Sequence, residues 1–261
     1  GPGEDTLYVY GEADLSNYTI TNIQSLEIRS DVSMSADQFE FFESVNGDGR
    51  SIIRIVNKGT SPSTVKLSDA LSENKLQNLG MIEIGKDVTL EISSPDVFGG
   101  ARVLVGEGKV QGSGQLNLPE TFAIESTLDV RDAAGSDARG KAEVLDRVIS
   151  GKYGEVISNT NGNDYLVGTD SADTFELSGG GNDVVSARDG DDTFVISGPG
   201  TKKLLSTGGN ETVDLSQASA AADIDLTYGG TLGTDLTDIQ LGTGGGSSGA
   251  YAMLGHGGLS S

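Results

Sequence analysis

The sequence predicts an all-β fold: a parallel β-solenoid followed by a β-roll built from nonapeptides, with one or two short helices. Three observations lead to this prediction. Apolar and polar residues alternate in short runs, a long repeat returns with an offset of 56 residues, and a repeat of nine residues begins near Asn159. Alternation with a period of two is typical of strands, and fixed repeat lengths are typical of stacked units.

The long repeat occupies the first half of the chain. Six apolar residues return 56 positions later: Ile20, Ile23, Leu26, Ile28, Val32 and Met34 correspond to Leu76, Leu79, Ile82, Ile84, Val88 and Leu90. A β-sandwich would show the same alternation, but it would not require this register. A solenoid with repeats of about 52–56 residues is therefore favoured over residues 1–134.

Two segments are predicted to be helical. Residues 36–44 follow Ser35, a residue type that caps helix N-termini well. Residues 136–149 place four apolar side chains on one helical face: Ala142, Leu145, Val148 and Ile149. This second helix would form a linker or cap within residues 135–158.

The short repeat spans residues 159–216 and carries a polar residue at a fixed place. Six copies of nine residues start at positions 159, 168, 178, 187, 197 and 206. The sixth position is Asp164, Asp173, Asp183, Asp192, Lys202 and Glu211. The eighth position is always apolar: Leu166, Phe175, Val185, Phe194, Leu204 and Val213. Nine residues hold one turn and one short strand, so we expect the eighth residue to point inward.

Turns of a solenoid alternate between two edges, so every second copy lies on the same edge. We therefore expect Asp164 to stack with Asp183 and Asp173 to stack with Asp192. Two carboxylates held a few ångströms apart repel each other unless a cation lies between them. Ca²⁺ suits this place because it takes about six to eight oxygens from carboxylates and carbonyls. At Lys202 the ammonium is expected to replace a cation rather than to bind one.

The same spacing defines the candidate calcium ligands. Glycines at the fourth position allow the positive φ that turns carbonyls toward an ion, and the third position adds side-chain oxygens. The candidate set is Asn161, Gly162, Asp164, Asp170, Asp173, Gly181, Asp183, Asp189, Gly190 and Asp192. Residues 159–240 hold 14 acidic and 3 basic residues, so this segment should be unstable without counterions. We expect metal binding and folding to be coupled.

These copies resemble the repeat of the RTX family, Gly-Gly-x-Gly-x-Asp-x-apolar-x. The resemblance covers about 55 of the 261 residues. It implies a calcium-bound parallel β-roll in a protein exported by bacterial type I secretion, as in secreted toxins, proteases and lipases, adhesins and surface-layer proteins. The first two positions are rarely Gly-Gly, and Ser171 and Ala172 replace the usual turn. Roughly two or three occupied calcium sites are therefore expected rather than a full stack.

Composition excludes several classes of function. The chain has 39 acidic and 17 basic residues, a formal charge of -22, no cysteine and one histidine. Such a polyanion repels phosphate backbones, so nucleic acid is not expected as a partner. The absence of cysteine excludes disulfides and thiolate zinc sites. No transmembrane segment is expected, because the longest apolar runs are far shorter than the roughly 20 residues that a membrane helix needs.

An enzymatic role is not expected either. Carbohydrate-cleaving sites need clustered carboxylates, a basic residue and aromatic platforms. The arginines are scattered, and the tyrosines cluster only near the start of the chain: Tyr8, Tyr10 and Tyr18. His256 lies in a Gly/Ser-rich stretch, 242–261, that is predicted to be a flexible tail. Residues 217–241 are expected to continue or to cap the solenoid.

The sequence thus predicts a non-enzymatic, calcium-binding structural segment of a larger bacterial protein that is secreted or displayed on the cell surface. An S-layer lattice or an adhesin fits this prediction. The expected partners are calcium ions, with self-association or a cell-surface polysaccharide left open. The alternative is a carbohydrate-binding or carbohydrate-cleaving β-helix.

Overall fold

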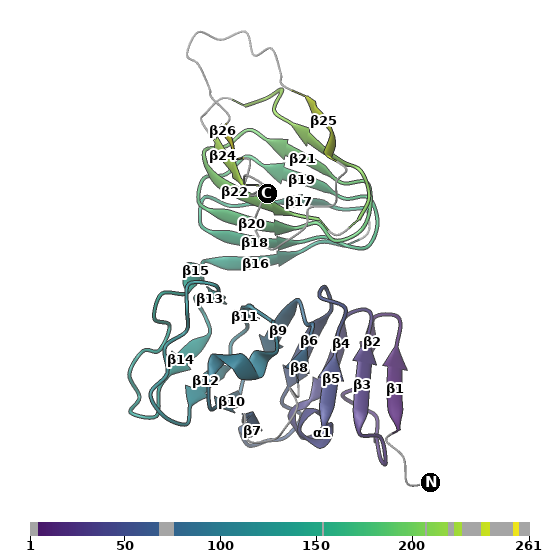
Figure 1. The fold of residues 1–261 in the computed structure, drawn as a ribbon, viewed down its shortest axis with the longest axis vertical. Coiled ribbons are helices and arrows are strands. Elements are labelled where there is room, and N and C mark those ends of the chain that lie inside the picture. The colour runs from purple at the N-terminus through teal and green to yellow at the C-terminus, as the bar shows by residue number, and fades with distance from the viewer. Residues whose placement is uncertain are drawn as a thin grey trace, which may run out of the picture. The chain divides into compact units, whose positions relative to one another are not determined.

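The protein is a parallel β-solenoid that has one short α-helix among its described residues (Figure 1). The computed structural model describes residues 5–67, 76–152, 154–206, 208–218, 222–225, 236–240 and 253–255. The chain divides into two compact units, Gly1–Val144 and Leu145–Ser261. Neighbouring strands pair in parallel in both units, which confirms the predicted fold class.

Three sheets form the first unit. One contains, in spatial order, β1 (Thr6–Val9), β3 (Ser25–Ile28), β5 (Ser44–Asn46) and β8 (Leu76–Gln77). A second contains β2 (Ala13–Asp14), β4 (Val32–Ser35), β6 (Ile52–Val56), β9 (Met81–Ile84), β11 (Val103–Val105), β13 (Ala123–Glu125) and β15 (Glu143–Leu145). The third contains β7 (Ser63–Leu67), β10 (Val88–Ile92), β12 (Lys109–Gly112) and β14 (Asp129–Arg131). The helix α1 (Ala36–Phe41) and the 3₁₀ helix η1 (Pro95–Phe98) lie in connections between strands.

The core of the first unit follows from the alternation of side chains along each strand. In β10, Val88, Leu90 and Ile92 are buried, while Thr89 and Glu91 between them are partly exposed. The inward side chains of all three sheets join in one apolar cluster, to which Phe39, Phe42 and Phe98 from the connections also belong. Burying this continuous cluster is the main stabilising contribution to the unit.

The predicted 56-residue register is wrong, although the solenoid that it indicated is present. Leu26 aligns through Val45 with Leu76, so two rungs separate residues that are 50 positions apart. Leu26 and its predicted equivalent Ile82 lie in different sheets. Side chains alternate with a period of two, so an even offset of 50 or 56 residues preserves the inward and outward faces equally well. Alternation alone therefore does not distinguish the two registers.

One of the two predicted helices is present. Helix α1 starts after Ser35, whose hydroxyl accepts the Gln38 amide in a capping box, and it ends at Phe41 rather than at residue 44. In the part of the chain that the structure describes, no helix is long and apolar enough to cross a membrane.

The second predicted helix, over residues 136–149, is wrong. This stretch contains β15 and the start of β16 (Arg147–Ser150) instead. Gly140 has φ of 61°, which interrupts a helix, and the β-branched residues that follow it favour strands. In β16, Ile149 aligns with Leu166 of the next rung, so its apolar spacing serves a sheet rather than a helical face.

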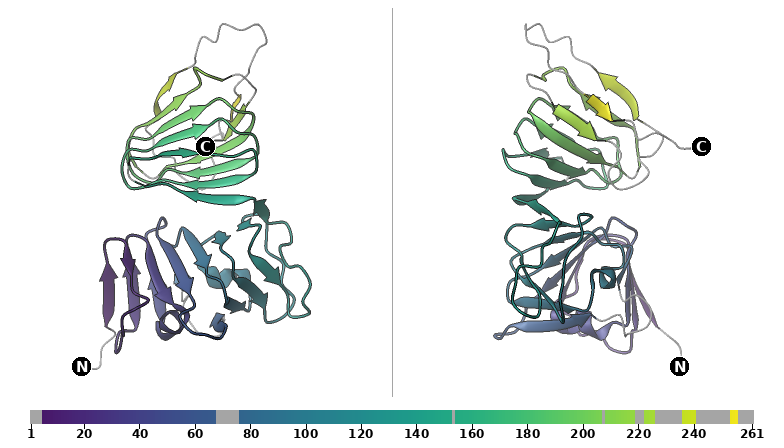
Figure 2. Two further views of the ribbon diagram at one scale, coloured as in Figure 1. Left: turned by 180° about the vertical axis from the view of Figure 1, so that it is seen from behind. Right: turned by 60° about the vertical axis from the view of Figure 1, so that its left-hand side comes forward.

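Two sheets form the second unit, and successive strands along most of the chain alternate between them (Figure 2). One contains β16, β18 (Asp164–Val167), β20 (Asp183–Ser186), β22 (Gly200–Leu205), β24 (Ala222–Asp225) and β26 (Met253–Gly255). The other contains β17 (Val156–Ser158), β19 (Thr174–Leu177), β21 (Thr193–Ile196), β23 (Glu211–Asp214) and β25 (Leu236–Gln240).

The nonapeptide pattern correctly predicts the interior of this unit. All six residues at the eighth position are buried: Leu166, Phe175, Val185, Phe194, Leu204 and Val213. The rings of Phe175 and Phe194 stack with centroids 5.3 Å apart. Within 217–241, β24 and β25 extend the two sheets. The predicted tail 242–261 contains β26, which pairs with β24, and its other residues, including His256, lie outside the described residues.

Turns of adjacent rungs stack so closely that some positions accept only glycine. Gly181 has φ of +83°, and a Cβ atom there would lie 1.9 Å from the carbonyl oxygen of Gly162. Gly190 has φ of +129°, and its Cβ atom would lie 2.5 Å from the backbone of Ser171. The predicted positive φ is thus present at Gly181 and Gly190. It is absent at Gly162, which is not among the glycines with positive φ.

Replacing Gly181 with Ala should destabilise the second unit by at least roughly 1–3 kcal/mol, because the new methyl group forces both strained backbone and a clash with the turn below. The matched control is Gly180→Ala, where φ is not positive and the nearest atom to a Cβ is an ordinary 3.6 Å away. Urea unfolding followed by circular dichroism measures both variants. Equal stability of the two variants would show that the turns do not stack as described.

Candidate metal centre

The turns of the second unit place the sixth-position residues along two edges. Asp164, Asp183 and Lys202 lie on what we call the first edge, and Asp173, Asp192 and Glu211 lie on the second edge. All six are buried: their exposed fractions are 0%, 0% and 0% on the first edge, and 4%, 0% and 5% on the second. The predicted stacking of alternate copies is therefore confirmed. Side chains of these types are rarely buried completely unless they are paired.

Each aspartate accepts hydrogen bonds from its own turn. The amide and the hydroxyl of Thr160 donate to Asp164 Oδ2 at 2.6 and 2.8 Å. On the second edge, the amide of Thr169 donates to Asp173 Oδ2 at 2.6 Å. Such bonds to a charged acceptor are among the stronger ones in proteins. They fix the tight turn that precedes each strand.

The carboxylates also connect one rung to the next. The amide of Asp164 donates to Asp183 Oδ1 at 2.9 Å, and the amide of Asp173 donates to Asp192 Oδ1 at the same distance. Each bond spans 19 residues along the chain. The first strand residue of one rung is thus held by the side chain of the rung that follows.

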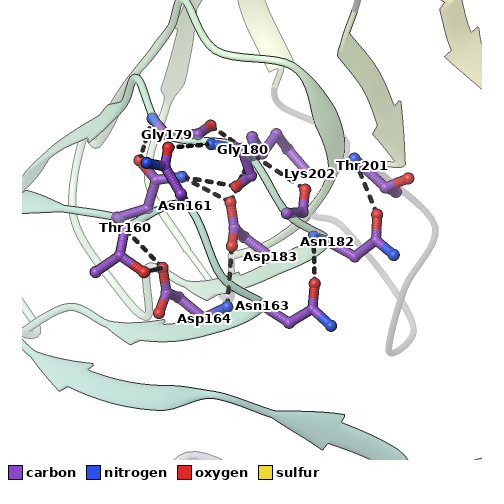
Figure 3. A network of polar contacts seen from close by, with 12 residues as sticks. Thr160, Asn161, Asn163, Asp164, Gly179, Gly180, Asn182, Asp183, Thr201 and Lys202 are labelled. Carbon is purple, nitrogen blue, oxygen red and sulfur yellow. Dashed lines mark hydrogen bonds and ion pairs between the residues drawn. The ribbon is translucent and has the colours of Figure 1, made fainter.

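The first edge contains its own cation, the ammonium of Lys202 (Figure 3). Lys202 Nζ lies 2.5 Å from Asp183 Oδ2 and donates to the carbonyl oxygens of residues 179, 180 and 181 at 3.3, 3.2 and 3.4 Å. Asn159 donates a further bond to Asp183 Oδ2 at 2.8 Å. Both charged side chains are completely buried. This geometry agrees with the expectation that Lys202 replaces a cation.

The second edge has a carboxylate where the first has this ammonium. Glu211 takes the place of Lys202, and its Oε1 accepts the hydroxyl of Ser206. Three buried acidic residues therefore succeed one another without a basic side chain in the column. The pKa of Asp192 is raised to about 7, chiefly by burial. The nearby carboxylates of Asp173 and Glu211 add to this effect, against the bond from the Asp173 amide.

Two carboxylate oxygens on these edges have no hydrogen-bond partner. They are Asp164 Oδ1 and Asp192 Oδ2, and no other buried side-chain oxygen among the described residues lacks one. Leaving a buried polar atom unsatisfied costs about 1–3 kcal/mol, and more when it is charged. Both oxygens belong to predicted calcium ligands. A cation bound there would satisfy them, so these residues fit the ion that the spacing predicts.

Matching positions on the two edges lie nine residues apart. Residues 179–181 and Asp183, which surround the ammonium, correspond to residues 188–190 and Asp192 on the second edge. On the second edge the aspartate has an unpaired oxygen, and Glu211 replaces the lysine. The same repeat thus presents one oxygen-lined place that is filled by an ammonium and one whose aspartate still lacks a partner.

The remaining candidate ligands are less buried. Asn161 is exposed, and its Oδ1 accepts the amide of Gly180 at 3.2 Å, so it ties two turns together. Asp170 is exposed. Asp189 is half-buried and lies against the turn of the next rung, 2.8 Å from where a Cβ of Gly208 would stand. The structure therefore concentrates the four sixth-position aspartates and leaves Asn161 and Asp170 at the surface.

Sequence reasoning missed two features of the edges. Thr160 and Thr169 bond to the aspartate of their own turn, and both stand at the second position of consecutive copies, which is the signal that was available. A ladder of side chains also runs along the fifth position. There the Asn163 side chain accepts the Asn182 amide at 2.8 Å, and Asp191 accepts the Asn210 amide at 2.9 Å.

In the ranges that the structure describes, no three His, Cys, Asp or Glu side chains form a group that could hold a metal ion. A cation on either edge would therefore need backbone carbonyls as well as carboxylates, as the oxygens around Lys202 illustrate. No protein-family model, curated protein or solved structure matches the chain.

In a chelator, the chain should be more stable at pH 5.5 than at pH 8. The folded pKa of Asp192, about 7, lies above its ordinary value of 3.8, so between these values the folded chain holds a proton that the unfolded chain releases. The stability contributed by this residue is lost as the pH rises through 7. Thermal unfolding should show a difference of several degrees.

Asp192→Asn should remove most of that pH dependence, because the amide is neutral throughout the range. Asp191→Asn, at an exposed neighbouring position, should preserve it. A wild-type melting temperature that rises from pH 5.5 to pH 8 in chelator would contradict the assignment to Asp192.

Replacing Lys202 with Met should destabilise the chain in chelator by roughly 3–5 kcal/mol, because Asp183 would remain as an uncompensated buried charge. Chemical denaturation measures the loss. The control is Lys203→Met, which removes a charge at the adjacent, half-buried position and should change stability much less. Equal losses in the two variants would show that the Lys202–Asp183 pair has no special role.

Proposed function

We propose that this chain is a non-enzymatic, calcium-binding structural segment of a bacterial surface protein, of S-layer or adhesin type, exported by type I secretion. The proposal joins the nonapeptide resemblance to the chemistry of the two edges. Their carboxylates are buried and bonded to backbone amides, which suits a structural cross-link better than acid–base catalysis.

The observation that carries the calcium proposal is the difference between the two edges. On the first edge, carbonyls and a carboxylate surround a buried ammonium. On the second edge, the corresponding aspartate has an unpaired buried oxygen, and a glutamate stands in the place of the lysine. A column of three buried carboxylates needs positive charge, and the protein supplies none there. A bound cation would restore the balance that Lys202 provides on the other edge.

Calcium is the cation that these ligands suit best. The available donors are carboxylates, carbonyls and hydroxyls, and the chain has no cysteine and one histidine. Ca²⁺ accepts many oxygens in a flexible geometry, whereas Mg²⁺ demands a near-ideal octahedron and keeps several waters. Zinc prefers nitrogen and sulfur ligands. Asp192 and Asp173 on the second edge are the principal ligands in this proposal, and Asp164 with Asp183 forms the corresponding pair on the first edge.

Coupling between calcium and folding gives the segment a role in export. With a formal charge of -22, the chain repels itself until cations bind. A chain of this kind stays extended where free calcium is scarce and folds where it is plentiful, outside the cell. Parallel rungs stacked end to end then suit a stalk, an adhesin or a lattice.

Calcium should raise the thermal stability of the chain, and calorimetric titration should detect binding of roughly two or three ions. Asp192→Asn and Asp173→Asn should each weaken binding and reduce the stabilisation. Asp223→Asn serves as the control, because Asp223 is exposed and lies outside the two edges. The absence of binding heat, together with identical melting in chelator and in millimolar calcium, would refute the proposal.

A further inference from the structure

The first unit carries an exposed pair of aromatic rings that its core does not use. On β1, Leu7 and Val9 face inward, whereas Tyr8 is 56% exposed and Tyr10, just beyond the strand, is 76% exposed. The two rings are nearly parallel, with an interplanar angle of 12° and centroids 6.2 Å apart. Together they present a substantial aromatic surface to solvent. Exposed aromatic surface of this kind commonly marks a binding site.

Fixed polar groups lie beside the rings. Tyr8 aligns with Glu27 of β3. Both carboxylate oxygens of Glu27 accept the Asn46 side-chain amide at 3.0 Å, and Arg29 lies 3.4 Å from one of them. Asn78 in turn donates to the Asn46 oxygen at 2.9 Å. These side chains are held in place before any ligand arrives, so little conformational entropy remains to be lost on binding.

We call Tyr8, Tyr10, Glu27, Arg29 and Asn46 the tyrosine face. It combines aromatic rings with a carboxylate, a guanidinium and an amide, which together donate and accept hydrogen bonds. A sugar ring has a face of C–H groups that packs against an aromatic ring, and hydroxyls around its rim that pair with planar polar groups. Each part of such a ligand therefore meets a matching group on this surface.

Charge decides which sugars fit. Glu27 and Arg29 neutralise each other within the tyrosine face, so no local positive charge is left to attract an acidic glycan. The net charge of -22 also repels polyanions. We propose that the tyrosine face binds a neutral polysaccharide. This binding is independent of the second-unit edges, so it does not rest on the calcium proposal.

The test measures binding of the full chain to soluble dextran, mannan and galactan by calorimetry, with dextran sulfate as the acidic comparison, in chelator and in calcium. The chain should bind at least one neutral polysaccharide and bind dextran sulfate more weakly. Tyr8→Ala and Tyr10→Ala should each weaken binding by about ten-fold or more, through loss of ring contact. Tyr8→Phe keeps the ring and should stay within about three-fold of the wild type.

Tyr18→Ala is the matched control, because Tyr18 is 67% exposed and lies outside the tyrosine face. It should bind as the wild type does, and circular dichroism should show that every variant is folded. No binding to any neutral polysaccharide would overturn the proposal, as would equal losses in Tyr8→Ala and Tyr18→Ala. A change of oligomeric state in Tyr8→Ala without polysaccharide binding would assign the face to self-association and also overturn it.

Discussion

The second unit depends on the carboxylate at the sixth position of each turn. This group accepts hydrogen bonds from its own turn and, one rung later, from the first strand residue of the rung before it. The arrangement stacks acidic side chains 19 residues apart in buried columns, so every column needs compensating positive charge or polar hydrogen. The first edge meets that need with Lys202. The second edge meets it only in part, which is why one oxygen of Asp192 has no partner.

The two units keep their rungs in register by different means. In the first unit, Val45 follows Leu26 by 19 residues and Leu76 follows Val45 by 31, so the connections vary in length. Its wide core tolerates this variation, because phenylalanines from the connections fill the space. In the second unit the core is narrow, and turns pack so closely that Gly181 admits no side chain. There the rung length is constant, and hydrogen bonds along the edges preserve it.

These differences explain how far sequence reasoning reached. A constant nine-residue period predicted which residues face inward and which aspartates share an edge, because little else fits so short a unit. The variable connections of the first unit hid its register, since an even offset preserves the alternation that was used to detect the repeat. Residues 136–149 were misjudged because Val148 and Ile149 fit an apolar face in either a helix or a strand. The threonines that bind Asp164 and Asp173 were missed because the search addressed metal ligands rather than turn-forming hydrogen bonds.

The attachment of Lys202 to the chain has a mechanical consequence. An ammonium on a covalent tether cannot diffuse away, so neither dilution nor a chelator strips it from Asp183. A solvent ion offers no such permanence. With one margin clasped by its own side chain and the other relying on visitors, loss of free cations should open the second unit as a book opens along its spine.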